Sequence, residues 1–342
     1  MRKYRSLLAL LFTCVLLLIQ FRADSSGNNL LIQKMTSQPV LLLTTPRELN
    51  PAISPSAQPI QEATLTAMPT STSSPTVTPT TEPSPTPTPS SPIPVGQSGD
   101  WEQIFSDEFT SNELDQSKWT ECYWWDYRGC TNGSSGELEW YQPENVLVED
   151  GYLLLRARAE TVRGSDGKTH PYASGMVSTG RDNSDTDTPL RFAFQYGYAE
   201  IRAKVPAGQG LWPAFWMLPT THNSTPEIDV MEFLGHAPDV IEMHYHYKDQ
   251  SGKLYDIGHE WTGPDFSADW HTFAIDWQPE RLVWYVDGVE RWRVEESEII
   301  PSEPMYLILN LAVGGDWPGN PDATTSFPSE FAIDYVRAWV RK

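Results

Sequence analysis

Residues 282–289, Leu-Val-Trp-Tyr-Val-Asp-Gly-Val, form an alternating apolar segment followed at once by the pair Asp287-Gly288. Alternation with a period of two is typical of a strand with one buried face, and Asp-Gly is a preferred pair for a type I′ hairpin turn. Similar segments, each bounded by Gly, Pro, Asn or Asp, recur at 151–159, 197–205, 272–277 and 332–340. No stretch has a long 3.6-residue apolar period, so the sequence predicts an all-β sandwich of two stacked antiparallel sheets.

One short segment, Glu227-Ile-Asp-Val-Met-Glu232, concentrates the acidic groups and has apolar sequence on both sides. On a regular strand Glu227 and Asp229 share one face, and Met231 rather than Glu232 comes next on that face. We interpret the apolar Met231 as the mark of a β-bulge, whose extra residue returns Glu232 to the face of the other two acids. The alternative is a solvated acidic strand at a sheet edge, and the apolar flanks favour a central strand instead.

Two carboxylates on such a ridge suit the hydrolysis of a glycosidic bond. One attacks the anomeric carbon, and the other protonates the departing oxygen and then activates water. A bulge between them is compatible with the carboxyl separation of about 5–5.5 Å that retaining enzymes use. Asp229 is expected to orient Glu227 and to control its charge, whereas Glu232, as the general acid, must keep its proton until substrate binds.

The first 26 residues are typical of a signal peptide or an N-terminal anchor. Basic residues precede an apolar run from Leu7 to Ile19, which is short for a membrane span. From Ser37 to Gly96 the chain consists mainly of Pro, Ser and Thr, so residues 27–98 are predicted to be a disordered, semi-rigid linker. Residues 99–342 then form the catalytic domain, secreted or extracytoplasmic, and tethered to the cell surface if the leader is not cleaved.

The composition excludes several kinds of partner. The chain of 342 residues has 45 acidic and 24 basic side chains and a net charge of -21, and only four of the acids precede residue 100. A domain this negative repels phosphate backbones and acidic lipids, so we expect no nucleic-acid partner and no membrane contact except through the leader. All 14 Trp lie between Trp101 and Trp339, more than a core of this size requires. They indicate either a Trp-rich core or aromatic surfaces for the flat apolar faces of sugars.

The acidic segment, preceded by Gly210-Leu-Trp-Pro-Ala-Phe-Trp-Met-Leu-Pro, closely resembles glycoside hydrolase family 16, in the branch with a bulged Glu-x-Asp-x-x-Glu motif. Further matching blocks follow one another at 104–109, 114–119, 136–146, 195–206, 310–319, 327–328 and 333–337. The resemblance implies a jelly-roll β-sandwich with a concave substrate cleft, and retaining hydrolysis of internal β-linkages. It also implies Glu227 as nucleophile, Asp229 as its helper and Glu232 as acid/base. The blocks are most similar to β-1,3-glucanases of the laminarinase type.

The same resemblance implies several substrate-binding residues. Trp212 and Trp216 match cleft tryptophans whose rings stack on sugar faces, although either ring can instead belong to the core. Trp317 is a further candidate for an aromatic platform, and Asn145 for a polar sugar contact.

At two positions the sequence departs from the family pattern. Where the family commonly has Thr-x-His near the acid/base, the chain has His244-Tyr-His246, so His246 fits and threonine is replaced. Where many laminarinases have Ser-Gly-Arg, the chain has Ser174-Gly-Met176. The loss of that arginine removes a sugar hydrogen-bonding group, so the identity of the sugar polymer stays open.

A structural calcium ion is a hypothesis from the resemblance, and catalysis is expected to need no cofactor. The family's calcium site maps to the backbone carbonyls of Glu108 and Gly151 and to Asp334, and calcium prefers several oxygen ligands. Separately, Cys122 and Cys130 lie eight residues apart in an exported chain, which predicts a local disulfide, with two free thiols as the alternative.

Parts of the sequence are compatible with three other functions. His244-x-His246 on a sandwich suggests a cupin-like metal site, but no glutamate follows within a few residues. A non-catalytic glucan-binding module typically lacks the acids that this chain keeps, and a transglycosylase uses the same chemistry with a sugar acceptor. We therefore predict a monomeric endo-glucanase that cuts β-1,3 or mixed β-1,3-1,4 linkages of a neutral β-glucan, with a galactan as the alternative substrate.

Overall fold

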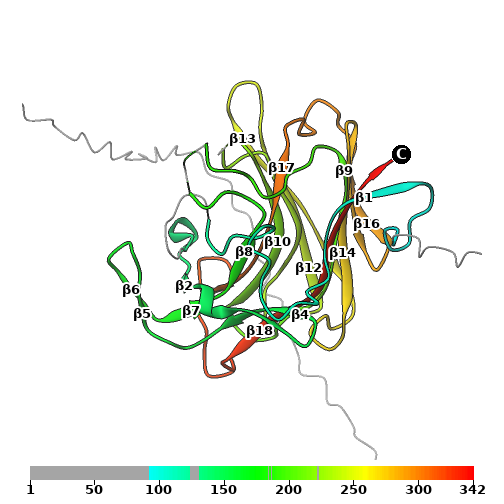
Figure 1. Ribbon diagram of the computed structural model, residues 1–342. Helices are drawn as coiled ribbons and strands as arrows, with labels where there is room; N and C mark the ends of the chain where they lie inside the picture. The colour runs from blue at the N-terminus through cyan, green and yellow to red at the C-terminus, as the bar shows by residue number, and fades with distance from the viewer. Residues whose placement is uncertain (1–91, 124–130, 184, 186, 222) are drawn as a thin grey trace, which may run out of the picture. The chain divides into compact units, whose positions relative to one another are not determined.

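The computed structural model describes residues 92–123, 131–183, 185, 187–221 and 223–342. The predicted leader, most of the predicted linker and Cys130 lie outside these described residues. No helix in the described part of the chain is long and apolar enough to span a membrane. The main described strands form two large antiparallel sheets, which face each other (Figure 1).

The larger sheet contains β1 (Trp101–Asp107), β3 (Val146–Glu149), β4 (Tyr152–Ala157), β9 (Gly197–Lys204), β14 (His271–Gln278), β15 (Arg281–Val286), β16 (Val289–Val294) and β18 (Ser329–Arg341). Its order is β16-β15-β14-β9-β18-β4-β3, and β1 pairs with the second half of β18. In the turn between β15 and β16, Asp287 and Gly288 have φ angles of 51° and 71°. Positive φ at both central residues is the mark of a type I′ turn, so the predicted hairpin is confirmed.

The smaller sheet contains β8 (Met176–Ser178), β10 (Leu211–Pro219), β11 (Glu227–Phe233), β12 (Val240–Lys248), β13 (Leu254–Thr262) and β17 (Met305–Val313). Its order is β13-β12-β11-β10-β17-β8. The acidic strand β11 is therefore central, and the alternative of an acidic edge strand is wrong. Both neighbours of β11 can thus contribute side chains to the face that carries the acids.

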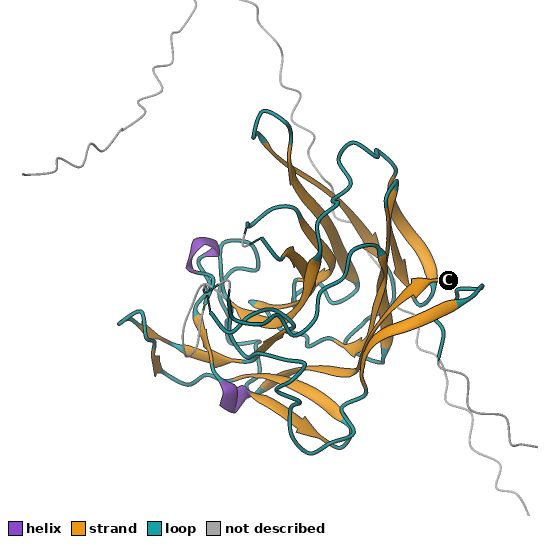
Figure 2. Ribbon diagram, turned by 45° about the horizontal axis from the view of Figure 1, so that its top comes forward, coloured by secondary structure: helices purple, strands orange, loops and turns teal. Residues whose placement is uncertain are grey.

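The remaining regular elements are short (Figure 2). They are the 3₁₀ helices η1 (Gly133–Ser135) and η2 (Pro143–Asn145) and the strands β2 (Glu139–Tyr141), β5 (Val162–Arg163), β6 (Thr169–His170) and β7 (Tyr172–Ser174). Strand β2 pairs in parallel with β7, which continues towards β8 of the smaller sheet.

The hydrophobic core lies between the two sheets. Strand β4 shows how the sequence builds it, because its residues alternate between half-buried and buried, with Leu153 and Leu155 facing inward. Phe215 and Phe233 of the smaller sheet and Trp277 of the larger sheet belong to the same buried cluster. Each large apolar side chain buried in this way contributes about 1.5–3 kcal/mol, so one shared core holds the two sheets together.

The last residues of the predicted linker lie against the domain. The backbone N–H of Val95 donates to a carboxylate oxygen of Glu200 at 3.1 Å, and the indole of Trp339 donates to the carbonyl of Pro92 at 2.8 Å. The predicted boundary after residue 98 is therefore too late. Composition alone predicted disorder here because it does not reveal that β9 and β18 offer these partners.

Candidate active site

Strand β11 contains the predicted β-bulge. Between Asp229 and Glu232, two residues of β11 stand opposite a single residue of β12. On the β10 side Met231 is in register, and Val230 is the residue left without a partner. The bulge is confirmed, but the extra residue is one position earlier than the sequence suggested. Both residues are apolar and buried, so the hydrophobic pattern did not distinguish them.

The bulge sorts the side chains of β11 onto two faces. The core receives its apolar members, Ile228, Val230, Met231 and Phe233. Glu227, Asp229 and Glu232 instead line one cavity on the opposite face. Two consecutive residues pointing into the core are what return the last acid to the face of the first, as the extra residue of a bulge does.

Both carboxylate oxygens of Glu232 have partners. The Nε1–H of Trp212 donates to Oε1 at 3.0 Å, and Nδ1 of His244 lies 2.9 Å from Oε2. Burial lowers the pKa of His244, but its hydrogen bond to Glu232 and the charges of the surrounding carboxylates outweigh burial, so the pKa is raised overall. A protonated His244 donates to Glu232, and the two contacts fix the orientation of this carboxyl group.

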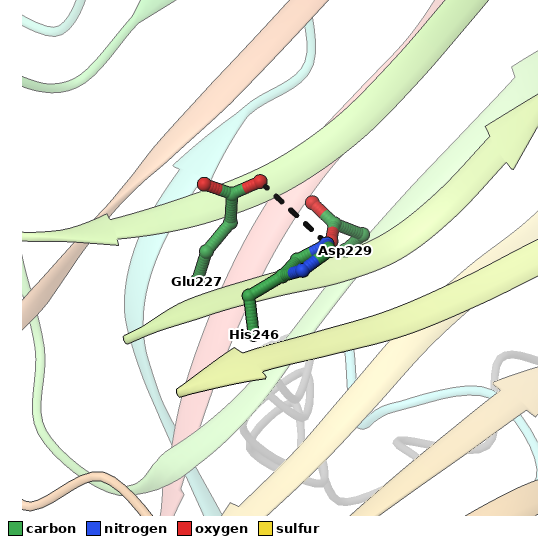
Figure 3. Close-up of side chains that lie close together, drawn as sticks. All are labelled: Glu227, Asp229 and His246. Atoms are coloured by element: carbon green, nitrogen blue, oxygen red, sulfur yellow. Dashed lines mark ion pairs between the residues drawn. The ribbon is translucent and has the colours of Figure 1, made fainter. Parts of the chain in front are cut away.

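Glu227 and Asp229 share a second histidine, which comes from β12 (Figure 3). The Nε2 atom of His246 lies 3.2 Å from Oδ2 of Asp229 and 4.0 Å from Oε1 of Glu227. The shorter contact lacks hydrogen-bond geometry, because this buried Oδ2 has no hydrogen-bond partner among the described residues. The pairing of Glu227 with His246 across the two strands explains why the three side chains meet.

Burial and the nearby negative charges favour the protonated forms of Glu227 and Asp229. Burial raises the pKa of Glu227 well above its usual value, and the charge of Asp229 raises it further while His246 opposes the change. Burial also raises the pKa of Asp229, which is only 3% exposed, and the charge of Glu232 adds to the effect. Glu227 and Asp229 lie so close together and so far from water that they do not readily ionise together.

All three predicted tryptophans lie at or beside the acids. Trp216 lines the cavity and donates its Nε1–H to Oδ1 of Asn310 at 2.7 Å. Trp317 is 40% exposed and stands edge-to-face with Trp212, with 5.3 Å between ring centroids. Its ring is also 5.6 Å from that of His244. Trp216 therefore forms part of the cavity wall, whereas Trp317 offers exposed aromatic surface.

The residue in place of the family's arginine is not a sugar-binding group. Met176 is fully buried in an apolar cluster that also contains Trp216 and Tyr141. Its side chain therefore packs beneath the wall of the cavity, where the arginine of many laminarinases would offer a cation. Cys122 belongs to the same cluster, and because Cys130 lies outside the described residues, the disulfide stays a prediction.

Asn145 is not brought to the cavity. It belongs to η2 and is 2% exposed, and its Oδ1 is buried without a hydrogen-bond partner among the described residues. The amide side chains that line the cavity are those of Asn132 and Asn310. The structure therefore does not bring Asn145 to the wall of this cavity, and its sugar contact stays a prediction.

The residues expected to bind calcium lie around the larger sheet. Gly151 is in the turn between β3 and β4, and Asp334 is the extra residue of a bulge in β18. Arg202 donates to Oδ2 of Asp334 at 2.6 Å, and Arg337 binds the side chain of Glu108. The second carboxylate oxygen of Asp334 and the two backbone carbonyls are the oxygen donors that calcium prefers, so the donor set fits in type.

Two residues of the site were missed as functional residues. The sequence indicated His244 as the residue that replaces threonine and as half of a cupin-like metal site, but not as the partner of Glu232 that it is. Alternation along β12 places it on the same face as His246, and this signal was available. Asn310 accepts from Trp216 and donates to the hydroxyl of Tyr141 at 3.0 Å. Asn310 was named only as the first residue of a matching block, because the apolar sequence around it indicates a buried strand, as the structure confirms.

Three acids on a bulged central strand line one cavity together with Trp212 and Trp216. This fold and this site define a glycoside hydrolase of the β-sandwich class. The family model described as glycosyl hydrolases family 16 matches residues 141–337, and the chain belongs to this family. A second model, of the beta-glucan synthesis-associated proteins SKN1/KRE6/Sbg1, matches residues 39–224 and so ends before the acidic strand.

Individual relatives agree with this assignment. A beta-glucanase of Rhodothermus marinus is 35% identical over 70% of this chain and 85% of its own length. The glucan endo-1,3-beta-glucosidase A1 of Niallia circulans is 32% identical over 69% of this chain, which spans only 37% of that longer relative.

Solved structures confirm the jelly-roll fold. The laminarinase catalytic domain from Thermotoga maritima has a TM-score of 0.62 and 35% identity, and the match covers 71% of this chain and 99% of that one. The endo-beta-1,3-glucanase from Pyrococcus furiosus has a TM-score of 0.61 and 36% identity, with 70% and 94% covered.

Proposed function

We propose that this protein is a retaining endo-glycosidase that hydrolyses internal β-1,3 or mixed β-1,3-1,4 linkages of a neutral β-glucan. The observation that carries the proposal is the bulge in β11, which turns Glu227, Asp229 and Glu232 towards one cavity. Asp229 stands between the other two, since its carboxylate falls within 4.8 Å of ligand atoms from each side of the site.

In the first step Glu227 attacks the anomeric carbon and forms a covalent glycosyl-enzyme intermediate. A nucleophile must be ionised, yet burial and the charge of Asp229 raise the pKa of Glu227. We infer that Asp229 holds the shared proton, because it is the more deeply buried of the two acids. A neutral Asp229 no longer repels the charge on Glu227, and His246 beside both groups stabilises that charge.

Glu232 acts as the acid in the first step and as the base in the second. It protonates the departing glycosidic oxygen and then removes a proton from the water that attacks the intermediate. Trp212 and His244 hold its two oxygens, so the carboxyl group stays in position through both steps.

The cleft favours an uncharged polymer. Trp216 lines the cavity and Trp317 is exposed beside it, and aromatic rings pack against the apolar faces of sugars. No lysine or arginine is among the residues that line this cavity in the described part of the chain, so a sulfated or uronic polymer finds no counter-charge. The relatives whose names specify endo-1,3-beta-glucosidase or endo-1,3-1,4-beta-glycanase support a glucan.

The test is a substrate panel of laminarin, lichenan, agarose, carrageenan and xyloglucan, scored by reducing-sugar release and product size. We expect internal cleavage of laminarin, with lichenan second, and products that keep the β-configuration. Hydrolysis confined to a galactan contradicts the substrate and leaves the mechanism standing. Products longer than the substrate indicate transglycosylation, the second candidate, which the match to glucan synthesis-associated proteins favours.

We also propose that the protein acts as a monomer outside the cytoplasm, released or tethered by residues 1–98. Cell fractionation and N-terminal sequencing of the mature protein test this, and a purely cytoplasmic product with an intact leader contradicts it.

A structural calcium ion held by the carbonyls of Glu108 and Gly151 and by Asp334 is a further proposal. Calcium bound there would stabilise the fold without entering catalysis. We expect EDTA to lower Tm and added calcium to restore it, with Asp334→Asn insensitive to both. If the Tm of the native protein does not change with EDTA or with added calcium, this site is contradicted.

A further inference from the structure

A second pair of carboxyl groups lies at the cavity and has no part in the mechanism above. Glu137 lines the same cavity as the acids of β11, on the wall formed by the segment that follows η1. Glu139, the first residue of β2, is fully buried behind it. The two carboxyl groups are within hydrogen-bonding range of each other. No lysine or arginine forms an ion pair with either acid among the described residues.

The inner member of the pair is held rigidly. The backbone N–H of Val313 donates to one oxygen of Glu139 at 2.8 Å, and the hydroxyl of Thr131 donates to the other at 3.3 Å. Val313 is the last residue of β17, so Glu139 is fixed to the end of a fully buried strand of the smaller sheet. Glu139 in turn supports Glu137, whose own carboxyl group accepts from the backbone N–H of Asn132 at 3.3 Å.

Burial and mutual repulsion favour one shared proton on this pair. Burial raises the pKa of Glu137 well above its usual value, and the charge of Glu139 raises it further. Burial also raises the pKa of Glu139, although its hydrogen bonds oppose the change. Two desolvated carboxyl groups in hydrogen-bonding range carry a single charge, because the second ionisation has no counter-charge to offset it. A buried carboxyl pair without a counter-charge destabilises the fold, so its presence at the cavity indicates a functional role.

Hydrogen bonds connect this wall to the aromatic part of the cavity. Trp216 donates to Asn310, and Asn310 donates to the hydroxyl of Tyr141. That hydroxyl makes a hydrogen bond with Glu137. The carboxyl group of Glu137 is therefore fixed relative to the ring of Trp216, and both border the space in which a sugar reaches Glu227 and Glu232.

We propose that Glu137 is a substrate-contacting residue whose carboxyl group hydrogen-bonds a glucan hydroxyl within the catalytic cavity, and that Glu139 positions it. The proposal rests on the proposed function, because it assigns a contact to the same substrate. The proton of the pair lies in the hydrogen bond between the two carboxyl groups, so Glu137 offers its oxygen lone pairs to the sugar and accepts from a hydroxyl group. This contact binds the sugar before and during the reaction alike, so its loss acts on KM rather than kcat.

The experiment measures kcat and KM on laminarin for the full chain and for Glu137→Leu, Glu137→Gln and Glu144→Leu. Glu144 is the matched control, an exposed glutamate of η2 outside the cavity. We expect Glu137→Leu to raise KM about tenfold with kcat changed less than about threefold, because one buried hydrogen bond to substrate is lost. Glu137→Gln keeps a donor and an acceptor and is expected to stay within about threefold of the native KM, as is Glu144→Leu.

Thermal melting separates this role from a structural one. Glu137→Leu removes one of two competing carboxyl groups, so its Tm is expected to equal or exceed that of the native protein. If this variant does not fold, Glu137→Ala carries the same kinetic expectation.

An unchanged KM in Glu137→Leu, or an equal loss in Glu137→Gln, overturns the inference. A native protein that cleaves no polymer of the panel overturns the proposed function instead, so the two failures are distinguishable.

Discussion

The acids of the cleft and the acids around β18 have different kinds of basic partner. Around β18 the carboxylates have arginine partners: Glu330 meets Arg156 at 2.7 Å, and Asp334 meets Arg202 at 2.6 Å. In the cleft, Glu227, Asp229 and Glu232 have only histidines as basic partners among the described residues. Arginines neutralise the carboxylates around β18, whereas the carboxylates of the cleft compete with one another for protons.

This difference separates a structural use of carboxylates from a catalytic one. A partly exposed ion pair with arginine keeps a carboxylate ionised and contributes little to stability. A buried carboxylate without a permanent cation destabilises the fold, but its charge can change during a reaction. Histidine suits the second case, because its own charge changes near neutral pH. Substitutions in the two regions are therefore expected to have opposite effects on stability, and only those in the cleft are expected to lower activity.

The largest effect is expected at the two acids that perform the chemistry. Glu227→Gln and Glu232→Gln each remove a group that forms or protonates a bond, so kcat on laminarin is expected to fall about a thousandfold or more. Reducing-sugar release measures the loss. Laminarin binding, measured by calorimetry, is expected to persist in both variants. Retention of more than a tenth of native activity in either variant contradicts its assigned role.

A smaller loss of activity, together with a gain of stability, is expected for Asp229→Asn. The pKa of Asp229 is raised in the folded state, so the folded protein binds this proton more tightly than the unfolded chain, and stability falls as pH rises above about 4. The amide cannot ionise and removes this loss, so Tm is expected to rise by about 2–4 °C at pH 8 and to change little at pH 4.

Activity on laminarin is expected to fall about tenfold to a hundredfold in Asp229→Asn, because the amide orients Glu227 but cannot exchange a proton with it. Melting curves at pH 4 and pH 8, together with kcat, test both parts. A Tm gain that is equal at the two pH values speaks against a raised pKa of Asp229.

An intermediate effect on activity is expected from Trp212→Phe. The variant keeps an aromatic ring but loses the Nε1–H that donates to Glu232. With one oxygen of the acid/base released, kcat is expected to fall about tenfold, the cost of one hydrogen bond to a charged group, while Tm stays within about 3 °C. A variant that keeps native kcat and changes only KM shows that the ring, and not its N–H, is what the site requires.

The smallest effect is expected at the paired acid of β18. Glu330→Gln removes an ion pair with Arg156 whose members are partly exposed, so stability is expected to fall by about 0–1 kcal/mol and activity to stay native. The difference is expected to shrink further in 1 M salt, since salt screens the pair. Urea denaturation at two salt concentrations measures it, and a gain in stability contradicts the contrast between the two regions.

The sequence was informative wherever the physics is local. Alternation along 282–289 with Asp287-Gly288 predicted a hairpin that the backbone angles confirm. An apolar residue out of step in an acidic strand predicted the bulge to within one position. Contacts between distant residues were less accessible. Asn145 matched a family pattern but does not line the cavity, and the apolar sequence around Asn310 did not indicate its bond with Trp216.

The order of side chains along each strand, and hence the acid ridge of β11 and the apolar face behind it, follows from the amino acids themselves, because a strand alternates its faces residue by residue. Which groups share a proton does not follow from that order. His244 reaches Glu232 because β12 lies beside β11, and Glu139 backs Glu137 because the end of β17 offers a free N–H. Burial and charge depend on every neighbour that folding supplies, so the chemistry of the cleft is a property of the assembled sheets.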